Sequence, residues 1–242
     1  MIPIDDNLPN RYPPLVTYGL IGLNVALFVM ELKLEATGQL GAFLQSWGVV
    51  SDRMTSVVTD AIRNPSPAAW VALIVMSAGP LLFSMFLHSS FSQILGNMLF
   101  LWVFGKRIEE ILGHGRFLLF YIVCGILTAI AQVAIAPNLA VPIIGANGAV
   151  SAILGAYLLN FPKAKIESLL PLLILFIPIE VPALFYLMWW FIQQAFYGIG
   201  QLTVLRMVNP TSLGYWANGV GLFIGAGLVS LLVKYKPKTA IY

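Results

Sequence analysis

The chain has 242 residues, of which 59% are hydrophobic and 10% are charged, and its mean hydropathy is +0.88. A soluble domain carries about 25% charged residues, so this composition excludes an ordinary water-soluble protein. The 13 lysines and arginines leave a net charge of +3, but they are too few and too scattered for a surface that follows nucleic-acid phosphates. We therefore expect a membrane protein that binds no nucleic acid.

The first apolar segment, residues 12–30, carries no formal charge and is long enough for one crossing, which needs about 20 apolar residues. Acidic and proline-containing residues precede it and no small-residue cleavage site follows, so a retained helix is expected, not a signal peptide. Residues 117–161 are too long for one helix, and Pro137, Pro142 and Gly145 divide them into two. The prediction is a single domain, residues 1–242, with membrane helices at residues 13–31, 91–112, 117–136, 145–161, 181–200 and 213–233.

Residues 34–90, between the first two helices, are expected to form a large external loop that is partly inserted in the membrane. Its apolar segment, residues 68–85, is interrupted by an Ala-Gly-Pro sequence, and a second short apolar segment, residues 169–179, contains two prolines. Both are predicted to lie at the membrane interface or to insert partly. The end of the second helix, KRIEEIL, is amphipathic and is expected to protrude from the membrane. The fold class predicted is an all-α bundle of six transmembrane helices.

The distribution of positive charge predicts the orientation, because cytoplasmic loops carry an excess of lysine and arginine. With six crossings both termini share one side, and that side receives nine of the 13 basic residues. They are Arg11, Lys106, Arg107, Arg116, Lys163, Lys165, Lys234, Lys236 and Lys238. Both termini are therefore expected in the cytoplasm, with residues 34–90 outside.

Five polar residues are predicted near the outer ends of three helices: His88, Gln93, Asn97, Asn147 and Asn218. Polar groups at membrane depth are costly and often functional. The first three are separated by five and four residues, so they can share one side of a loop-to-helix junction. We expect all five to converge on one external pocket.

Small residues at four-residue spacing predict close contacts between membrane helices. The predicted packing residues are Gly105, Glu109 and Gly113 in the second helix, Gly155 in the fourth, and Gly221 and Gly225 in the sixth. Two histidines and one cysteine are spread over different segments, so no metal site or other cofactor is expected.

Five stretches carry a family resemblance, and two of them are the opening MIPIDDNLPNRYPPLVTYGLIGLNVALFVMEL and IEVPALFYLMWWFIQQ of the fifth helix. FLHSSFSQILGNMLFLWVFGKRIEEILG combines a histidine-containing loop, an Asn-Met helix and a Gly-x-x-x-Glu-x-x-x-Gly motif, and IIGANGAVSAILGAYLLNFP and GYWANGVGLFIGAGL follow it. These stretches resemble the rhomboid intramembrane serine proteases, and the similarity extends over nearly the whole chain. It implies a rhomboid-like bundle of six membrane helices.

The resemblance also implies a serine on the fourth helix, in Gly-x-Ser-Gly, and a histidine on the sixth, in Ala-His. Here Asn147 and Asn218 occupy those two positions. A carboxamide is neither a useful nucleophile nor a base near neutral pH. Among the positions that stabilise the oxyanion in the family, His88 and Asn97 match, whereas Gln93 replaces a second histidine.

Two hypotheses for function follow from the resemblance. The first is a pseudoprotease that binds transmembrane segments of client proteins without cleaving them, through a lateral route between the second and fifth helices, on the helix-five face that includes Ala183. The second is an active rhomboid-type endopeptidase with a displaced nucleophile, Ser89 or Ser90 beside His88. The Trp-Arg pair of the family is Gly79-Pro80 here, a further departure. A transporter or channel is disfavoured because the predicted spans hold no charged pathway. The expected location is a bacterial plasma membrane.

Overall fold

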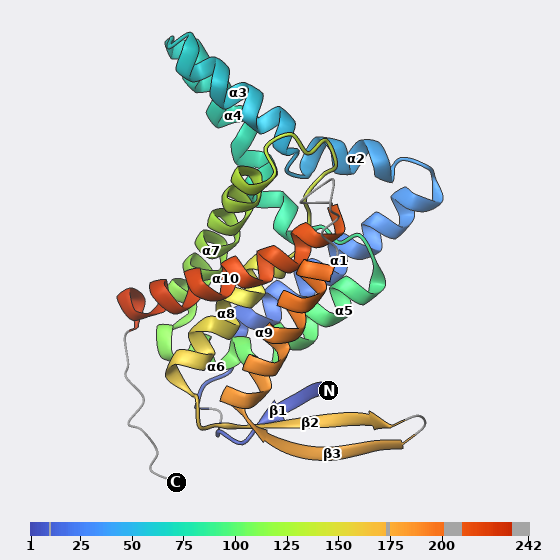
Figure 1. Cartoon of the computed structure of the whole chain (residues 1–242), viewed down its shortest axis with the longest axis vertical. Coiled ribbons are helices and arrows are strands. Elements are labelled where there is room, and N and C mark those ends of the chain that lie inside the picture. Colours follow the sequence, from blue (N-terminus) through green and yellow to red (C-terminus); the bar gives the residue numbers. More distant parts are fainter. Residues whose placement is uncertain (10, 173–174, 201–209, 234–242) are drawn as a thin grey trace.

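The computed structural model of the chain is a bundle of helices that carries a small β-sheet at one end (Figure 1). It describes residues 1–9, 11–172, 175–200 and 210–233. The helices are α1 (Leu15–Ala36), α2 (Leu40–Trp47), α3 (Ser51–Arg63), α4 (Pro67–Phe83), the 3-10 turn η1 (Ser84–Phe86), α5 (Phe91–Phe100), the π-helical turn η2 (Leu101–Gly105), α6 (Lys106–Leu112), α7 (His114–Ile135), α8 (Asn147–Asn160), α9 (Ala183–Gly200) and α10 (Pro210–Leu232). The strands are β1 (Ile2–Asp6), β2 (Lys165–Leu172) and β3 (Leu175–Pro182).

Within the described part of the chain, four helices are long and apolar enough to cross a membrane, namely Leu15–Ala36, Pro67–Phe86, His114–Ile135 and Gly214–Leu232. Three of them coincide with the first, third and sixth predicted spans, whereas Pro67–Phe86 lies in the predicted loop. The remaining predicted spans are shorter or interrupted, since η2 separates α5 from α6 and α8 has only 14 residues. The chain is thus a mostly helical, polytopic bundle, and six crossings stay a prediction.

The segment predicted as a loop, residues 34–90, is largely helical, which corrects the prediction. It contains α2, α3 and α4, and Figure 1 shows α3 and α4 side by side as an arm that projects from the bundle. Helix α4 also continues through Pro80, where an interruption was expected. A proline removes one backbone donor, and helices in membranes tolerate such a loss more readily than soluble ones.

A three-stranded antiparallel sheet, in the order β1-β2-β3, corrects the all-α prediction. Strands β2 and β3 form a hairpin that includes the segment predicted to be interfacial, residues 169–179, and β1 pairs with the root of β2. Prolines at positions 171, 178 and 182 oppose a helix here because each lacks a backbone donor. An edge strand such as β3 accepts proline, so the extended conformation is favoured.

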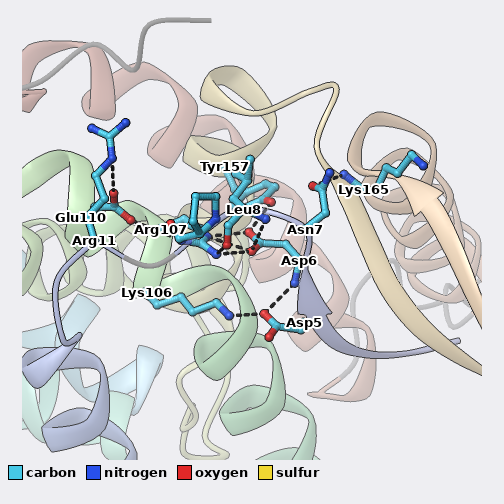
Figure 2. A network of polar contacts seen from close by, with 11 residues as sticks. Asp5, Asp6, Asn7, Leu8, Arg11, Lys106, Arg107, Glu110, Tyr157 and Lys165 are labelled. Carbon is cyan, nitrogen blue, oxygen red and sulfur yellow. Dashed lines mark hydrogen bonds and ion pairs between the residues drawn. The ribbon is translucent and has the colours of Figure 1, made fainter. Parts of the chain in front are cut away.

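The N-terminal residues cover the charged end of the second predicted span, and its protrusion from the membrane stays a prediction. The Asp6 carboxylate accepts hydrogen bonds from Arg107, whose Nε lies 2.9 Å from both carboxylate oxygens, and from the Tyr157 hydroxyl at 2.7 Å (Figure 2). Arg107 also donates to the carbonyl oxygens of Leu8 and Pro9. All three side chains, of Asp6, Arg107 and Tyr157, are buried. A buried ion pair therefore joins β1 to α6, and a hydrogen bond to the same carboxylate joins β1 to α8.

Glu109, predicted to be a packing residue, instead caps the first helix of the bundle. Its carboxylate accepts the backbone N–H groups of Val16 and Thr17, at 2.9 and 2.8 Å, and the Thr17 hydroxyl at 2.6 Å. These N–H groups belong to the first turn of α1, whose N-cap residue offers no side-chain bond. Glu109 also contacts His114 at the start of α7. This carboxylate thus connects three helices.

The two glycines predicted to flank Glu109 have different places. A Cβ at Gly105 would lie 3.3 Å from the side chain of Thr17, so this glycine does face a neighbouring helix. A Cβ at Gly113 would meet nothing within 4 Å, which corrects the packing prediction there. Gly113 has a φ of +80° and forms the turn between α6 and α7, a conformation that L side chains rarely adopt.

Helices α8 and α10 cross where glycines remove the side chains between their backbones. A Cβ added at Gly225 would lie 2.0 Å from the carbonyl oxygen of Ala152, and one at Gly221 would lie 2.4 Å from that of Gly148. Gly155 faces the backbone of α10 in the same way. Small residues permit this approach, which maximises van der Waals contact between helices in lipid. The ten consecutive residues 148–157 of α8 are accordingly buried.

We predict that Asp6→Asn destabilises the protein far more than Asp5→Asn. Neutralisation of Asp6 leaves the buried Arg107 charge without its main partner. This should lower the free energy of unfolding by about 3–5 kcal/mol. The Asp5 side chain is 47% exposed beside the buried Lys106, so water screens this pair and can replace part of the contact, and its loss should cost only about 1 kcal/mol. Partial burial raises the pKa of Asp5, but hydrogen bonds from Lys106 and the Asp6 backbone outweigh it, and the pKa is lowered. Unfolding of each variant by SDS titration in mixed micelles measures both free energies, and equal losses would contradict the prediction.

The helix crossing yields a second prediction. Gly225→Ala should destabilise the protein by about 1–3 kcal/mol, the usual range for overpacking, because the new methyl group would overlap the backbone of Ala152. Gly227, on the same helix, has open space around its Cβ position. Gly227→Ala is therefore the matched control and should be neutral or stabilising by up to about 1 kcal/mol. Thermal unfolding in detergent measures both, and a tolerated Gly225→Ala would show that the crossing is looser than described.

Candidate functional site

A cavity of about 800 Å³ lies among α5, α8, α9, α10 and residues 139–145. Its polar lining residues are Ser89, Ser90, Ser92, Gln93, Asn97, Gln132, Asn147, Ser151, Gln194 and Asn218. None of the described residues that line the cavity is Asp, Glu, Lys, Arg or His. The lining is therefore polar but uncharged, made largely of carboxamide and hydroxyl groups beside apolar side chains.

Four of the five polar residues expected to converge line this cavity: Gln93, Asn97, Asn147 and Asn218. The fifth, His88, is buried next to the cavity, where its Nε2 lies 3.3 Å from the Asn97 amide nitrogen. Residues up to 130 positions apart in the sequence are thus gathered around one space, as the polar pattern predicts. Their chemical roles stay a prediction.

Asn147 begins α8 and bonds across to α5. Its side-chain oxygen accepts a hydrogen bond of 2.9 Å from the Asn97 amide nitrogen. The same nitrogen faces His88 Nε2, so one NH₂ group can donate to both when that ring nitrogen is unprotonated. Burial lowers the pKa of His88 to about 4, which keeps the imidazole neutral at pH 7. Asn147, Asn97 and His88 therefore form a short, uncharged chain of polar groups.

Asn218, on α10, takes part in a separate chain. It accepts a hydrogen bond of 2.9 Å from the Ser151 hydroxyl on α8, and it donates one of 2.8 Å to the Gln194 oxygen on α9. None of these bonds joins Asn218 to Asn147. The close approach of α8 and α10 brings Ser151 within reach of Asn218, so the glycine contacts of the crossing help to set the geometry of the cavity.

Gln93 lines the cavity in the first turn of α5. Its side-chain oxygen accepts from the Ser89 backbone at 2.8 Å and from the Ser89 hydroxyl at 2.9 Å, and its amide nitrogen donates to the carbonyl of Ile144 at 3.3 Å. Ser90 is the N-cap of α5 and accepts from the Gln93 backbone. Gly145 has a φ of +116°, and a Cβ there would lie 2.3 Å from the Gln93 amide nitrogen. A glycine is thus required where the loop passes Gln93.

The serines proposed as displaced nucleophiles do not bond to a base. Ser89 donates to the amide oxygen of Gln93, and the Ser90 hydroxyl oxygen accepts from the Gln93 backbone. Nε2 of the His88 ring faces the Asn97 amide nitrogen. Activation of a serine needs a basic group that accepts its proton, and an amide oxygen is too weakly basic for that task.

Glu31 is a buried residue near the cavity that the sequence prediction missed. Both of its carboxylate oxygens lie 3.1 Å from the backbone N–H of His88, so α1 holds the start of the cavity loop in place. The signal was present in the sequence, because Glu31 is the first charge after an uncharged membrane segment. Its partner could not be foreseen, since the N–H of His88 is 57 residues away. Among the described residues, no group of three or more His, Cys, Asp or Glu side chains could hold a metal ion.

Comparison with known proteins places the chain in a family. The model of the family described as "Rhomboid domain" matches residues 76–235, more than half of the 242 residues. Rhomboid protease GluP of Bacillus subtilis (strain 168) is 40% identical over 72 residues, which are 30% of this chain and 14% of that protein. Rhomboid protein 1, mitochondrial, of Saccharomyces cerevisiae is 30% identical over 161 residues, which are 64% of this chain and 39% of that protein.

A third relative is the human presenilin-associated rhomboid-like protein, mitochondrial, which is 30% identical over 89 residues, 36% of this chain and 24% of that protein. The matched region thus spans less than half the length of each of these relatives. The match to the family and the apolar helices of the bundle confirm the resemblance found in the sequence. The chain is an integral membrane protein of the rhomboid family.

Proposed function

We propose that this chain is a rhomboid pseudoprotease, which binds transmembrane segments of client proteins in its polar cavity and does not cleave them. The observation that carries the proposal is the state of the two dyad positions. Asn147 and Asn218 hold carboxamides where the resemblance implies serine and histidine, and each is engaged in amide hydrogen bonds. A carboxamide supplies neither the nucleophile nor the base that acyl transfer requires.

The size and polarity of the cavity support a binding role. A cavity of about 800 Å³ that keeps uncharged donors and acceptors can receive a polar or unwound part of a membrane segment. In a low dielectric, such groups form interhelical hydrogen bonds worth about 0.6–2 kcal/mol each. Because the described residues that line it carry no charge, a client need not bring a compensating ion into the membrane.

A contact between α5 and α9 marks the proposed lateral route. Phe100, on α5, and Trp190, on α9, have ring centroids 5.7 Å apart, and both side chains line the cavity. Separation of these two rings would open the cavity toward lipid. Ala183, chosen from the sequence as part of this face, is instead fully buried at the first turn of α9. Trp190, rather than Ala183, is therefore the position at which the lateral route is tested.

The orientation with both termini in the cytoplasm stays part of the proposal. It rests on the excess of basic residues on that side. Of these residues, Lys234, Lys236 and Lys238 lie outside the described part of the chain. Placement in a bacterial plasma membrane also stays part of the proposal, since the relatives described above include one bacterial and two mitochondrial proteins.

Photo-crosslinking in native membranes tests client binding. Benzoylphenylalanine at Trp190 should form an adduct of defined mass, whereas the same group at Trp189, an exposed residue that does not line the cavity, should not. A yield ratio of about tenfold or more, equivalent to about 1.4 kcal/mol, is expected. A synthetic peptide with the transmembrane segment of the captured protein should compete. Equal yields at both positions, or no adduct at either, would count against the proposal.

Labelling with a fluorophosphonate tests for residual catalysis. The wild-type protein should not react, and Asn147→Ser with Asn218→His should leave cleavage of a transmembrane substrate near background. The double variant restores the two side chains, but Gln93 remains bonded to Ser89 and Ile144. The wild-type protein lacks both members of the dyad, which acts as a unit in a serine protease, and such a loss lowers turnover by about a million-fold. Labelling of the wild type that disappears in Ser89→Ala or Ser90→Ala would overturn the pseudoprotease proposal, and efficient cleavage by the double variant would show that the cavity remains poised for catalysis.

A further inference from the structure

The β2–β3 hairpin separates its charged residues from its apolar ones along its length. Lys165, Glu167 and Glu180 lie at the root, where Lys165 and Glu180 form an exposed ion pair of 2.9 Å. Toward the tip, the described residues 169–171 and 175–179 carry no charge and are almost entirely leucine, isoleucine, phenylalanine and proline. An ordinary solvent-exposed hairpin shows the opposite trend, with polar residues near its end.

The two faces of the hairpin differ as well. Alternate residues of a strand point to opposite faces. On one face, Ile166 and Ser168 are 0% and 1% exposed because they lie against the bundle. The same face continues outward through Ile177 and Leu175, which are 40% and 64% exposed. One apolar face therefore starts beneath the helices and extends beyond their edge.

Figure 1 shows why this face emerges. The sheet lies across the end of the bundle opposite the α3–α4 arm, and the hairpin reaches out past α9. The family is embedded in the membrane, so lipid surrounds the bundle. A face that is turned toward the bundle at its root is turned toward that lipid where the hairpin overhangs. The opposite face is turned away, and it carries Lys165, Glu167 and Glu180 at the root and the apolar Phe176 and Pro178 nearer the tip.

We propose that the overhanging part of the β2–β3 hairpin rests in the interfacial layer of the lipid bilayer, with Leu170, Leu175 and Ile177 toward the acyl chains and the Lys165–Glu180 pair toward water. Helix α9, which follows β3 directly, also exposes apolar side chains, among them Phe185, Trp189 and Phe196. The hairpin acts as a lateral support that fixes the depth and tilt of the bundle. This inference depends on the membrane location of the family and not on the pseudoprotease proposal.

The edge of the sheet favours lipid over a protein strand as the partner. Strand β3 is an edge strand, and an added strand would need its free backbone N–H groups. Pro178 and Pro182 remove two of these donors within β3. Lipid makes no such demand, because it contacts the side-chain face and not the strand edge. Exposed apolar side chains without a nearby charge suit the boundary between headgroups and acyl chains.

Site-directed spin labelling of the full chain tests the proposal. Cys124 is buried and is replaced by alanine, and single cysteines are introduced as Ile177→Cys and Glu180→Cys, which lie on one strand but on opposite faces. The labelled proteins are reconstituted in vesicles of phosphatidylcholine and phosphatidylglycerol. Accessibility of each label to oxygen, which concentrates in lipid, is compared with accessibility to a water-soluble nickel chelate.

The label at position 177 should show a ratio of oxygen to nickel accessibility several-fold above that at position 180, and detergent solution should reduce the difference. Thermal unfolding confirms that each labelled protein is folded, which is expected because both positions are exposed at the surface. Equal accessibility to nickel at both positions would mean that the hairpin stands in water. Protection of position 177 from both reagents would mean that a protein surface, such as a second copy, covers it. Either result overturns the proposal.

Discussion

The approach of the α8 and α10 backbones is the constraint on which the cavity depends. Helices in lipid gain little from the hydrophobic effect when they associate, so close packing must supply the attraction. Gly155, Gly221 and Gly225 provide it by leaving no side chain between the two backbones. The crossing brings Ser151 of α8 within 2.9 Å of Asn218 on α10. The polar groups of the cavity are thus positioned by residues that carry no polar side chain themselves.

The two ends of the bundle satisfy buried polar groups in different ways. Around the cavity, carboxamides bond to one another and to hydroxyls, and each amide can donate and accept without acquiring a charge. At the sheet end, the Asp6 carboxylate and the Arg107 guanidinium are buried together and held by further hydrogen bonds. In the proposed binding role, this uncharged network maintains the shape of the cavity, whereas proteolysis would require a proton to move between a nucleophile and a base.

The sequence predicted those features whose cause is local. Proline and glycine between residues 137 and 145 predicted the division between α7 and α8, and the four-residue spacing of Gly221 and Gly225 predicted a close helix contact. The polar pattern and the family motifs together indicated a shared pocket. Features with distant partners escaped prediction. Glu109 meets Thr17 across 92 residues, Asp6 meets Arg107 across 101, and periodicity reveals neither pairing.

The β2–β3 hairpin was missed for a different reason. The sequence of a short apolar run is equally compatible with a strand, an interfacial helix or a buried segment, because it has no polar face that would define a period. The helical arm at residues 51–83 shows the converse problem, because Gly79 and Pro80 indicate an interruption that a membrane helix can accommodate. Likewise, Gly113 fits the spacing of a packing motif but serves a turn, a distinction that depends on its φ of +80°.

The pairing of β1 with β2 also sets a rule of parity on the path of the chain. Strands of one sheet must lie on the same side of a membrane, so the residues between Asp6 and Lys165 pass through the bilayer an even number of times. When α1, the α5–α6 helix, α7 and α8 all cross, the number is four. The segment Pro67–Phe86 is long and apolar enough for a fifth passage, but that passage would separate the two strands. With those four crossings in place, this segment must lie along one surface of the membrane or dip into it and return. A few backbone hydrogen bonds at one end of the molecule would then decide the course of a helix at the other.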